Sequence, residues 1–71
     1  MSWNYRVVKR VVNGEEIYAI HEAYYKKGEE NPDSITEDSV SSVGETVKEL
    51  KKDFTLMMKA FKLPVLNHED F

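Results

Sequence analysis

Asn13-Gly14 interrupts two runs of aromatic and β-branched residues, which occupy residues 3–12 (WNYRVVKRVV) and 16–27 (EIYAIHEAYYKK). Asparagine and glycine both tolerate the positive φ angles that a two-residue type I′ turn requires. Aromatic and β-branched side chains fit the pleated, half-buried surface of a sheet. We therefore expect an antiparallel β-hairpin, with one strand at residues 3–12 and the other at residues 16–27.

The length of the turn decides which side chains of the hairpin share a face. A two- or four-residue loop places the odd-numbered side chains of the first strand beside the even-numbered side chains of the second strand. A three-residue loop with a bulge selects the opposite face of the second strand. The sequence leaves both registers open, and with them the question of which face of the sheet is exposed.

An amphipathic helix is predicted over residues 46–62. Thr46 and Glu49 form a capping box, in which each side chain bonds the backbone N–H of the other residue. Pro64 disfavours helical geometry in the residue before it, so the helix is expected to end at Lys62. Apolar residues recur at three- and four-residue spacing and form a stripe for the sheet: Val47, Leu50, Phe54, Met57, Met58 and Phe61.

The remaining segments complete a βββα order. Residues 28–38 (GEENPDSITED) are rich in turn-forming residues and predict a polar loop. Residues 39–43 (SVSSV) are expected to form a short third strand at the edge of an antiparallel sheet, and residues 63–71 a tail. The prediction is a single α+β domain over residues 1–71, in which a hairpin and a short third strand pack on one C-terminal helix.

Composition narrows the class of protein. The chain has 71 residues and no cysteine, and chains of this length often need a disulfide, a metal or a second copy of themselves for stability. The absence of cysteine and of a signal sequence predicts a cytoplasmic protein. No apolar run approaches the roughly 20 residues that cross a bilayer, so no membrane partner is expected. A homodimer is therefore the expected means of stabilisation.

Catalytic and metal chemistry are not expected. His21 and Glu22 are adjacent on a strand and point to opposite faces, so they are poorly placed to act together as base and orienter. His21 and His68 are far apart in the sequence, and the acidic residues of the polar loop lack the spacing of a calcium site. We predict a protein that is not an enzyme and that holds no cofactor or metal.

Aromatic and basic residues of the hairpin form the candidate interaction surface. They are Trp3, Tyr5, Arg6, Arg10, Tyr18, His21, Tyr24 and Tyr25. We expect this surface to bind a second copy of the chain or another protein, in a small interaction or regulatory module. The alternative is single-stranded nucleic acid, with bases stacked on the aromatic rings and phosphates bound by the arginines. The net charge of −3 disfavours that alternative.

Four stretches of the chain are similar to a family of small uncharacterised prokaryotic proteins. They are residues 18–25 (YAIHEAYY), Thr36-Glu37, residues 44–50 (GETVKEL) and residues 64–66 (PVL). This resemblance spans most of the chain and implies no known activity.

The βββα order also resembles the HicB-like antitoxin fold, in which a glycine, a threonine or serine and a glutamate begin the helix. Gly44, Thr46 and Glu49 occupy those positions here. The resemblance implies an antitoxin-like accessory protein that binds a protein partner. Residues 33–38 are polar, whereas that family carries a Pro-x-Leu-x-Gly-Cys segment at this point.

Overall fold

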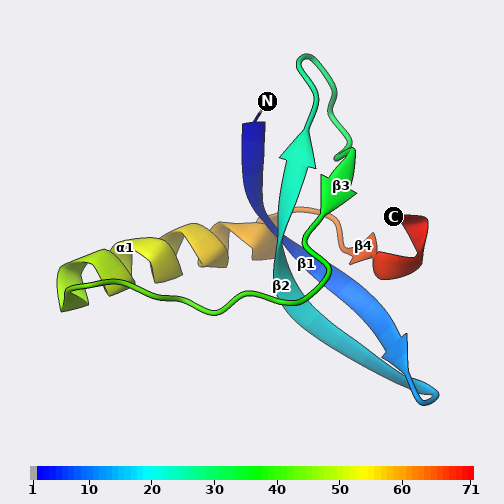
Figure 1. The fold of residues 1–71 in the computed structure, drawn as a ribbon, viewed down its shortest axis with the longest axis horizontal. Coiled ribbons are helices and arrows are strands. Elements are labelled where there is room, and N and C mark those ends of the chain that lie inside the picture. Colours follow the sequence, from blue (N-terminus) through cyan, green and yellow to red (C-terminus); the bar gives the residue numbers. More distant parts are fainter. Residues whose placement is uncertain (1) are drawn as a thin grey trace.

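The computed structural model describes residues 2–71, which form a curled, mixed four-stranded sheet and one α-helix (Figure 1). The strands are β1 (Ser2–Val12), β2 (Glu15–Tyr25), β3 (Ser34–Ile35) and β4 (Leu66–Asn67). Their order across the sheet is β3-β2-β1-β4. The edge strand β3 runs antiparallel to β2, and β4 runs parallel to β1. The predicted α+β class, with strands followed by a helix, is confirmed.

The hairpin turns at Asn13 and Gly14, whose φ angles are 51° and 81°. Val12 is paired with Glu15, so the turn contains two residues, and both adopt the left-handed conformation of a type I′ turn. The odd-numbered side chains of β1 therefore share a face with the even-numbered side chains of β2. This is the first of the two registers that the sequence left open.

The third strand lies at Ser34–Ile35, not at residues 39–43 as the sequence predicted. Ile35 is the one branched apolar residue of the polar loop, and it pairs with Ala23 at the edge of β2. Residues 39–43 form no strand in the described chain. Their backbone leaves the sheet after Val40, whose N–H donates to Ile20 O at 2.9 Å, and continues along the helix.

Helix α1 (Val47–Met58) begins as the sequence predicts. Thr46 is its N-cap, and the threonine hydroxyl accepts a hydrogen bond from the Glu49 N–H at 3.1 Å. The return bond differs from the prediction, because the Glu49 carboxylate accepts from the N–H of Glu45 at 3.0 Å. The chain enters the helix through a close turn at Gly44, where a Cβ would collide with the backbone of Leu50.

Helical geometry ends at Lys62, as predicted, but its last turn is a 3-10 helix, η1 (Lys59–Lys62). Leu63 is extended, with φ −108° and ψ 156°. The tail then crosses to the hairpin and forms β4, in which Leu66 pairs with Val8. A second 3-10 helix, η2 (His68–Asp70), follows.

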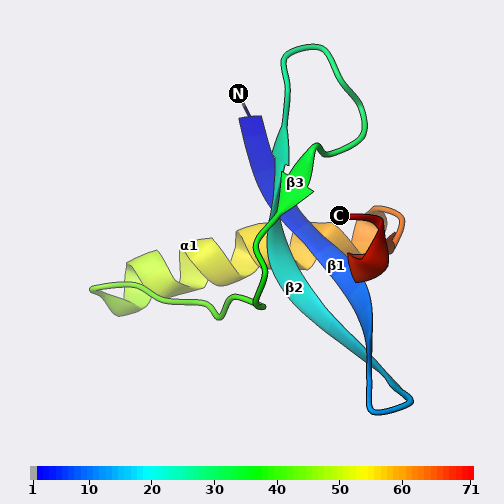
Figure 2. The ribbon, with the colours of Figure 1, turned by 45° about the vertical axis from the view of Figure 1, so that its right-hand side comes forward.

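Different segments of the chain pack on the two faces of the hairpin. Figure 2 shows α1 passing behind the hairpin, with η2 on the near side. The face behind carries Tyr5, which is bonded to α1, and the other carries Arg6 and His21, which are bonded to the tail and to the segment after β3. The apolar core is small and contains six residues: Val7, Val8, Ala23, Tyr25, Met57 and Ala60.

Candidate functional site

The apolar stripe of the C-terminal helix is open to solvent. Val47, Phe54 and Phe61 are 82%, 56% and 71% exposed, and Leu50 and Met58 are also exposed. We call these five residues the helix stripe. In α1 and η1 only Met57 and Ala60 are buried. The sequence predicted this stripe as the contact to the sheet, and the structure leaves most of it uncovered.

The position of α1 explains this exposure. The helix reaches the hairpin near its C-terminal end, and its first turns extend away from the sheet (Figure 1). The segment before the helix runs beside it and makes polar contacts, among them Ser42 Oγ to Leu50 O at 3.3 Å and Val43 N–H to the Asp53 carboxylate at 3.1 Å. The first turns of α1 therefore contact this polar segment and not the sheet (Figure 1).

The chain exposes more surface than its mass requires. Its accessible surface is 5604 Å², whereas a compact monomer of 8.3 kDa exposes about 4600 Å². Its radius of gyration is 12.8 Å, against about 11 Å for a compact domain of this length. Both quantities describe an extended molecule with unburied apolar area.

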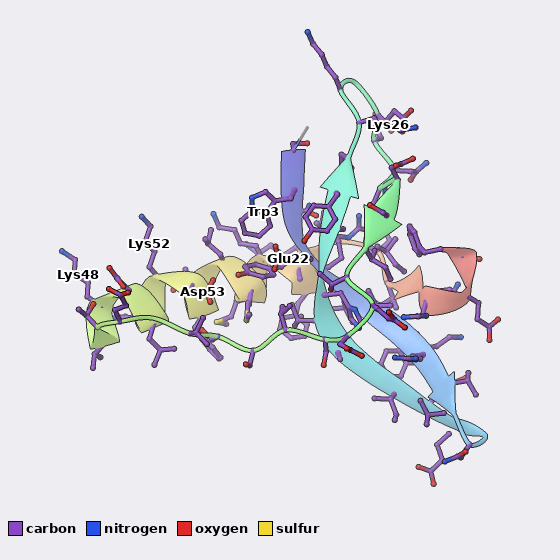
Figure 3. The ribbon with its side chains drawn as sticks, in the orientation of Figure 1. Trp3, Glu22, Lys26, Lys48, Lys52 and Asp53 are labelled. Atoms are coloured by element: carbon purple, nitrogen blue, oxygen red, sulfur yellow. The ribbon has the colours of Figure 1, made fainter. Side chains whose placement is uncertain are left out.

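A groove lies where the start of β1 meets the end of the helix. Its volume is about 490 Å³, and it is lined by Trp3, Asn4, Tyr5, Leu56, Lys59, Lys62 and Leu63. The rings of Trp3 and Tyr5 meet edge to face, with centroids 5.1 Å apart. Figure 3 shows Trp3 extending from β1 beside the helix, while Lys48 and Lys52 project from its far end.

A hydrogen bond joins the hairpin to the helix beside this groove. The Tyr5 hydroxyl donates to the Asp53 carboxylate at 2.6 Å. Burial, the hydrogen bond to Asp53 and the negative charges of Asp53 and Glu22 raise the pKa of Tyr5 to about 12. The same bond, together with the Val43 N–H, lowers the pKa of Asp53 below its ordinary value.

Arg6 is buried on the opposite face of the sheet. Its guanidinium donates to the Tyr25 hydroxyl at 2.9 Å and to Pro64 O at 2.7 Å. The Tyr25 hydroxyl in turn donates to Asn4 Oδ1 at 2.8 Å. Arg6 Nε is buried and has no hydrogen-bond partner among residues 2–71. The arginine thus ties β1 to the start of the tail.

The two histidines, far apart in sequence, meet on this face. Their ring centroids are 5.9 Å apart in an edge-to-face arrangement. His21 Nδ1 lies 2.9 Å from Thr36 O, and His68 Nε2 lies 3.1 Å from Glu37 O, so each imidazole holds the segment after β3. No group of three or more metal-binding side chains occurs in the part of the chain that the structure describes.

The residues predicted as one interaction surface are distributed over both faces and the interior. Arg6, His21 and Tyr25 are buried. Pro64 O of the tail bonds Arg6, Thr36 O bonds His21, and Arg6 and Asn4 bond the Tyr25 hydroxyl. Trp3, Arg10 and Tyr18 are exposed, and Tyr5 and Tyr24 are half-buried. Arg6 and Arg10 lie on the face opposite to Trp3 and Tyr5, so the predicted stacking surface with adjoining arginines is not assembled.

The sequence did not predict the exposure of the helix stripe or the groove at the end of the helix. Neither Lys59 nor Lys62 was among the predicted interaction residues, and no sequence pattern linked either lysine to Trp3. One signal for the exposure of the helix stripe was available in the sequence. The stripe runs the whole length of the helix, which is longer than a hairpin and a short edge strand are expected to cover.

In residues 2–71 no helix is long and apolar enough to cross a membrane.

The comparisons with known proteins give no match. The sequence fits no protein-family model, and no curated protein or solved structure shows significant similarity to the chain.

Proposed function

We propose that this chain is a small protein–protein interaction module that acts as a homodimer, in which α1 and η1 of one copy pack on α1 and η1 of the other. The observation that carries the proposal is the exposed helix stripe. Contiguous apolar surface of this kind marks interaction sites on proteins. The occupant of the stripe is a second copy of the chain.

The spacing of the stripe is self-complementary. Val47 and Phe61 are equally distant in sequence from Phe54, and so are Leu50 and Met58. In an antiparallel helix pair with a two-fold axis at Phe54, the Phe54 rings meet each other. Each smaller or branched residue then faces a longer one, Leu50 against Met58 and Val47 against Phe61. Such an isologous contact closes on itself and yields a dimer.

The surplus surface matches the size of such an interface. The accessible area exceeds that of a compact monomer by about 1000 Å². A standard interface removes about 800 Å² from each partner. A dimer interface of standard size would therefore bring the exposed area of each copy close to the value for its mass.

The small core of a single copy favours association with a second copy. Among residues 2–71, Val8 is the largest side chain that is fully buried, and the chain has no cysteine to form a disulfide. A single copy of this length is only marginally stable. A second copy is the partner that is present whenever the chain is made, so folding and association are coupled. The antitoxin-like accessory role implied by the HicB-like resemblance would use the surface that the dimer leaves free.

Sedimentation equilibrium of three variants tests this proposal. The wild-type chain is expected to sediment with twice the mass of one chain. Phe54→Glu places a charge on the two-fold axis and is expected to shift the mass to that of the monomer. Lys52→Glu changes a residue of the same helix by two charge units away from the stripe and should remain a dimer. A wild-type chain that stays monomeric while folded would contradict the proposal and indicate another protein as the partner.

A further inference from the structure

The groove between β1 and the helix end combines apolar walls with two cations. Trp3, Tyr5, Leu56 and Leu63 supply aromatic and aliphatic surface. Lys59 and Lys62 are both exposed and also line the groove. Its volume of about 490 Å³ lies within the range of about 300–1000 Å³ that small-molecule sites occupy.

The charges of the groove are unbalanced. In residues 2–71 the ion pairs join Lys9 to Glu16 and Lys26 to Asp33, and neither lysine of the groove takes part in one. No acidic side chain lines the groove. The negative charges of Asp53 and Glu22 act on the Tyr5 hydroxyl, but neither residue lines the groove. Lys59 and Lys62 are therefore the two charged side chains of the lining, opposed there by about half a negative charge at the end of the helix.

We propose that this groove binds a small amphipathic carboxylate, a molecule with an apolar body and one anionic end. The apolar body would lie against Trp3 and Leu56, and the carboxylate would bind the ammonium groups of Lys59 and Lys62. A few polar groups at the edge of an apolar cleft are the usual means of orienting such a ligand. The occupant is defined by charge complementarity, because a neutral or cationic molecule of the same shape would leave both lysines unpaired.

The groove is separate from the helix stripe. Leu56 lines the groove, whereas Phe54 and Met58, which lie two residues to either side of it, do not. Residues two apart on a helix point in different directions. Ligand binding is therefore expected in the dimer and does not depend on the dimer proposal.

The chain contains a single tryptophan, and that tryptophan lines the groove. Tryptophan fluorescence thus reports on the groove alone. We would titrate the full chain with octanoate, and in parallel with octanol and octylammonium. Octanoate is expected to give a saturable change in Trp3 emission. Loss of the charge-assisted bonds makes octanol bind about tenfold more weakly, and octylammonium should bind more weakly still.

Two double variants test whether the octanoate carboxylate binds at Lys59 and Lys62. Lys59→Gln with Lys62→Gln is expected to weaken octanoate binding about tenfold or more. Lys48→Gln with Lys52→Gln makes the same change in net charge at the far end of the helix (Figure 3) and should leave octanoate binding unchanged. Far-UV circular dichroism confirms that both variants remain folded, and if the first does not, the ranking of the three ligands on the wild-type chain still decides.

Three results would overturn the proposal. The first is an absence of saturable octanoate binding to the wild-type chain. The second is equal affinity for octanoate and octylammonium, which would show that the lysines do not select charge. The third is a response of Trp3 to a single-stranded thymidine oligonucleotide without a response to octanoate, which would assign the groove to nucleic acid.

Discussion

The Tyr5 hydroxyl donates a 2.6 Å hydrogen bond to the Asp53 carboxylate and so connects the first strand to the helix. These residues are 48 positions apart in the chain. Few other contacts hold α1 to the sheet, since Met57 is the only buried residue of that helix. The bond therefore has a large part in fixing the angle at which α1 leaves the hairpin.

Alkaline pH is expected to weaken the fold through Tyr5. The folded chain favours the neutral hydroxyl, because the pKa of Tyr5 is raised to about 12 from about 10 in the unfolded chain. Its contribution to stability is complete below pH 10 and is lost as the pH rises through about 12. Urea unfolding at pH 8 to 12 should show a decline that Tyr5→Phe reduces. An identical decline in both proteins would refute this role for the bond.

Loss of the helix cap is expected to destabilise the chain. Thr46→Ala removes the hydroxyl that accepts from the Glu49 N–H, and should lower the free energy of unfolding by about 1 kcal/mol. Thr55→Ala is the matched control, because the Thr55 hydroxyl donates to Lys51 O within the helix and such a bond adds little stability. Chemical denaturation measures both variants. Equal effects would contradict the capping role.

Replacing the buried Arg6 tests whether the fold depends on the geometry of the guanidinium hydrogen bonds or only on the positive charge. Arg6→Lys keeps the positive charge, but one ammonium cannot reproduce the planar contacts to the Tyr25 hydroxyl and Pro64 O. A buried polar group left without a partner costs about 1–3 kcal/mol, and the free energy of unfolding should fall by that amount. Arg10→Lys, on the exposed part of the same strand, should change it by less than about 0.5 kcal/mol. If Arg6→Lys lowered the free energy of unfolding no more than Arg10→Lys does, contacts other than those of Arg6 would hold the tail on the hairpin.

The melting temperature is expected to depend on protein concentration. A folded dimer that dissociates on unfolding becomes more stable by mass action as the concentration rises. Calorimetry over a hundredfold dilution series should therefore show a progressive fall in melting temperature. Phe54→Glu, if folded, should melt at a temperature that does not vary with dilution. A concentration-independent wild-type transition would contradict coupled folding and association.

Local signals in the sequence were sufficient for the hairpin and the helix. Asn13-Gly14 indicates a tight turn because both residue types tolerate the positive φ angles that this turn requires, and Thr46 fixes the helix start through one side-chain bond. These interactions join neighbouring residues, so the sequence alone reveals them. The register followed once the turn length was known.

Contacts between distant segments were not predictable in the same way. Residues 39–43 contain two valines and were expected as a strand, but the edge of β2 pairs with Ile35, which lies in a loop of turn-forming residues. The burial of Arg6 and His21 depends on carbonyl groups of Pro64 and Thr36, which no local pattern places there. Lys59 and Lys62 belong to a groove only because the end of the helix meets Trp3.

Distance measurement between spin labels tests the antiparallel dimer most directly. The chain has no cysteine, so Lys48→Cys and Thr55→Cys each carry one nitroxide on exposed helix positions. With a two-fold axis at Phe54 and a rise of about 1.5 Å per residue, the two copies of residue 48 are offset along the helix by about 18 Å and those of residue 55 by about 3 Å.

Double electron–electron resonance is therefore expected to give a clearly longer distance between copies at residue 48 than at residue 55. Phe54→Glu in either labelled chain should abolish the signal. Equal distances at the two positions would contradict the antiparallel arrangement, and the absence of any distance between copies in the wild-type background would contradict the dimer.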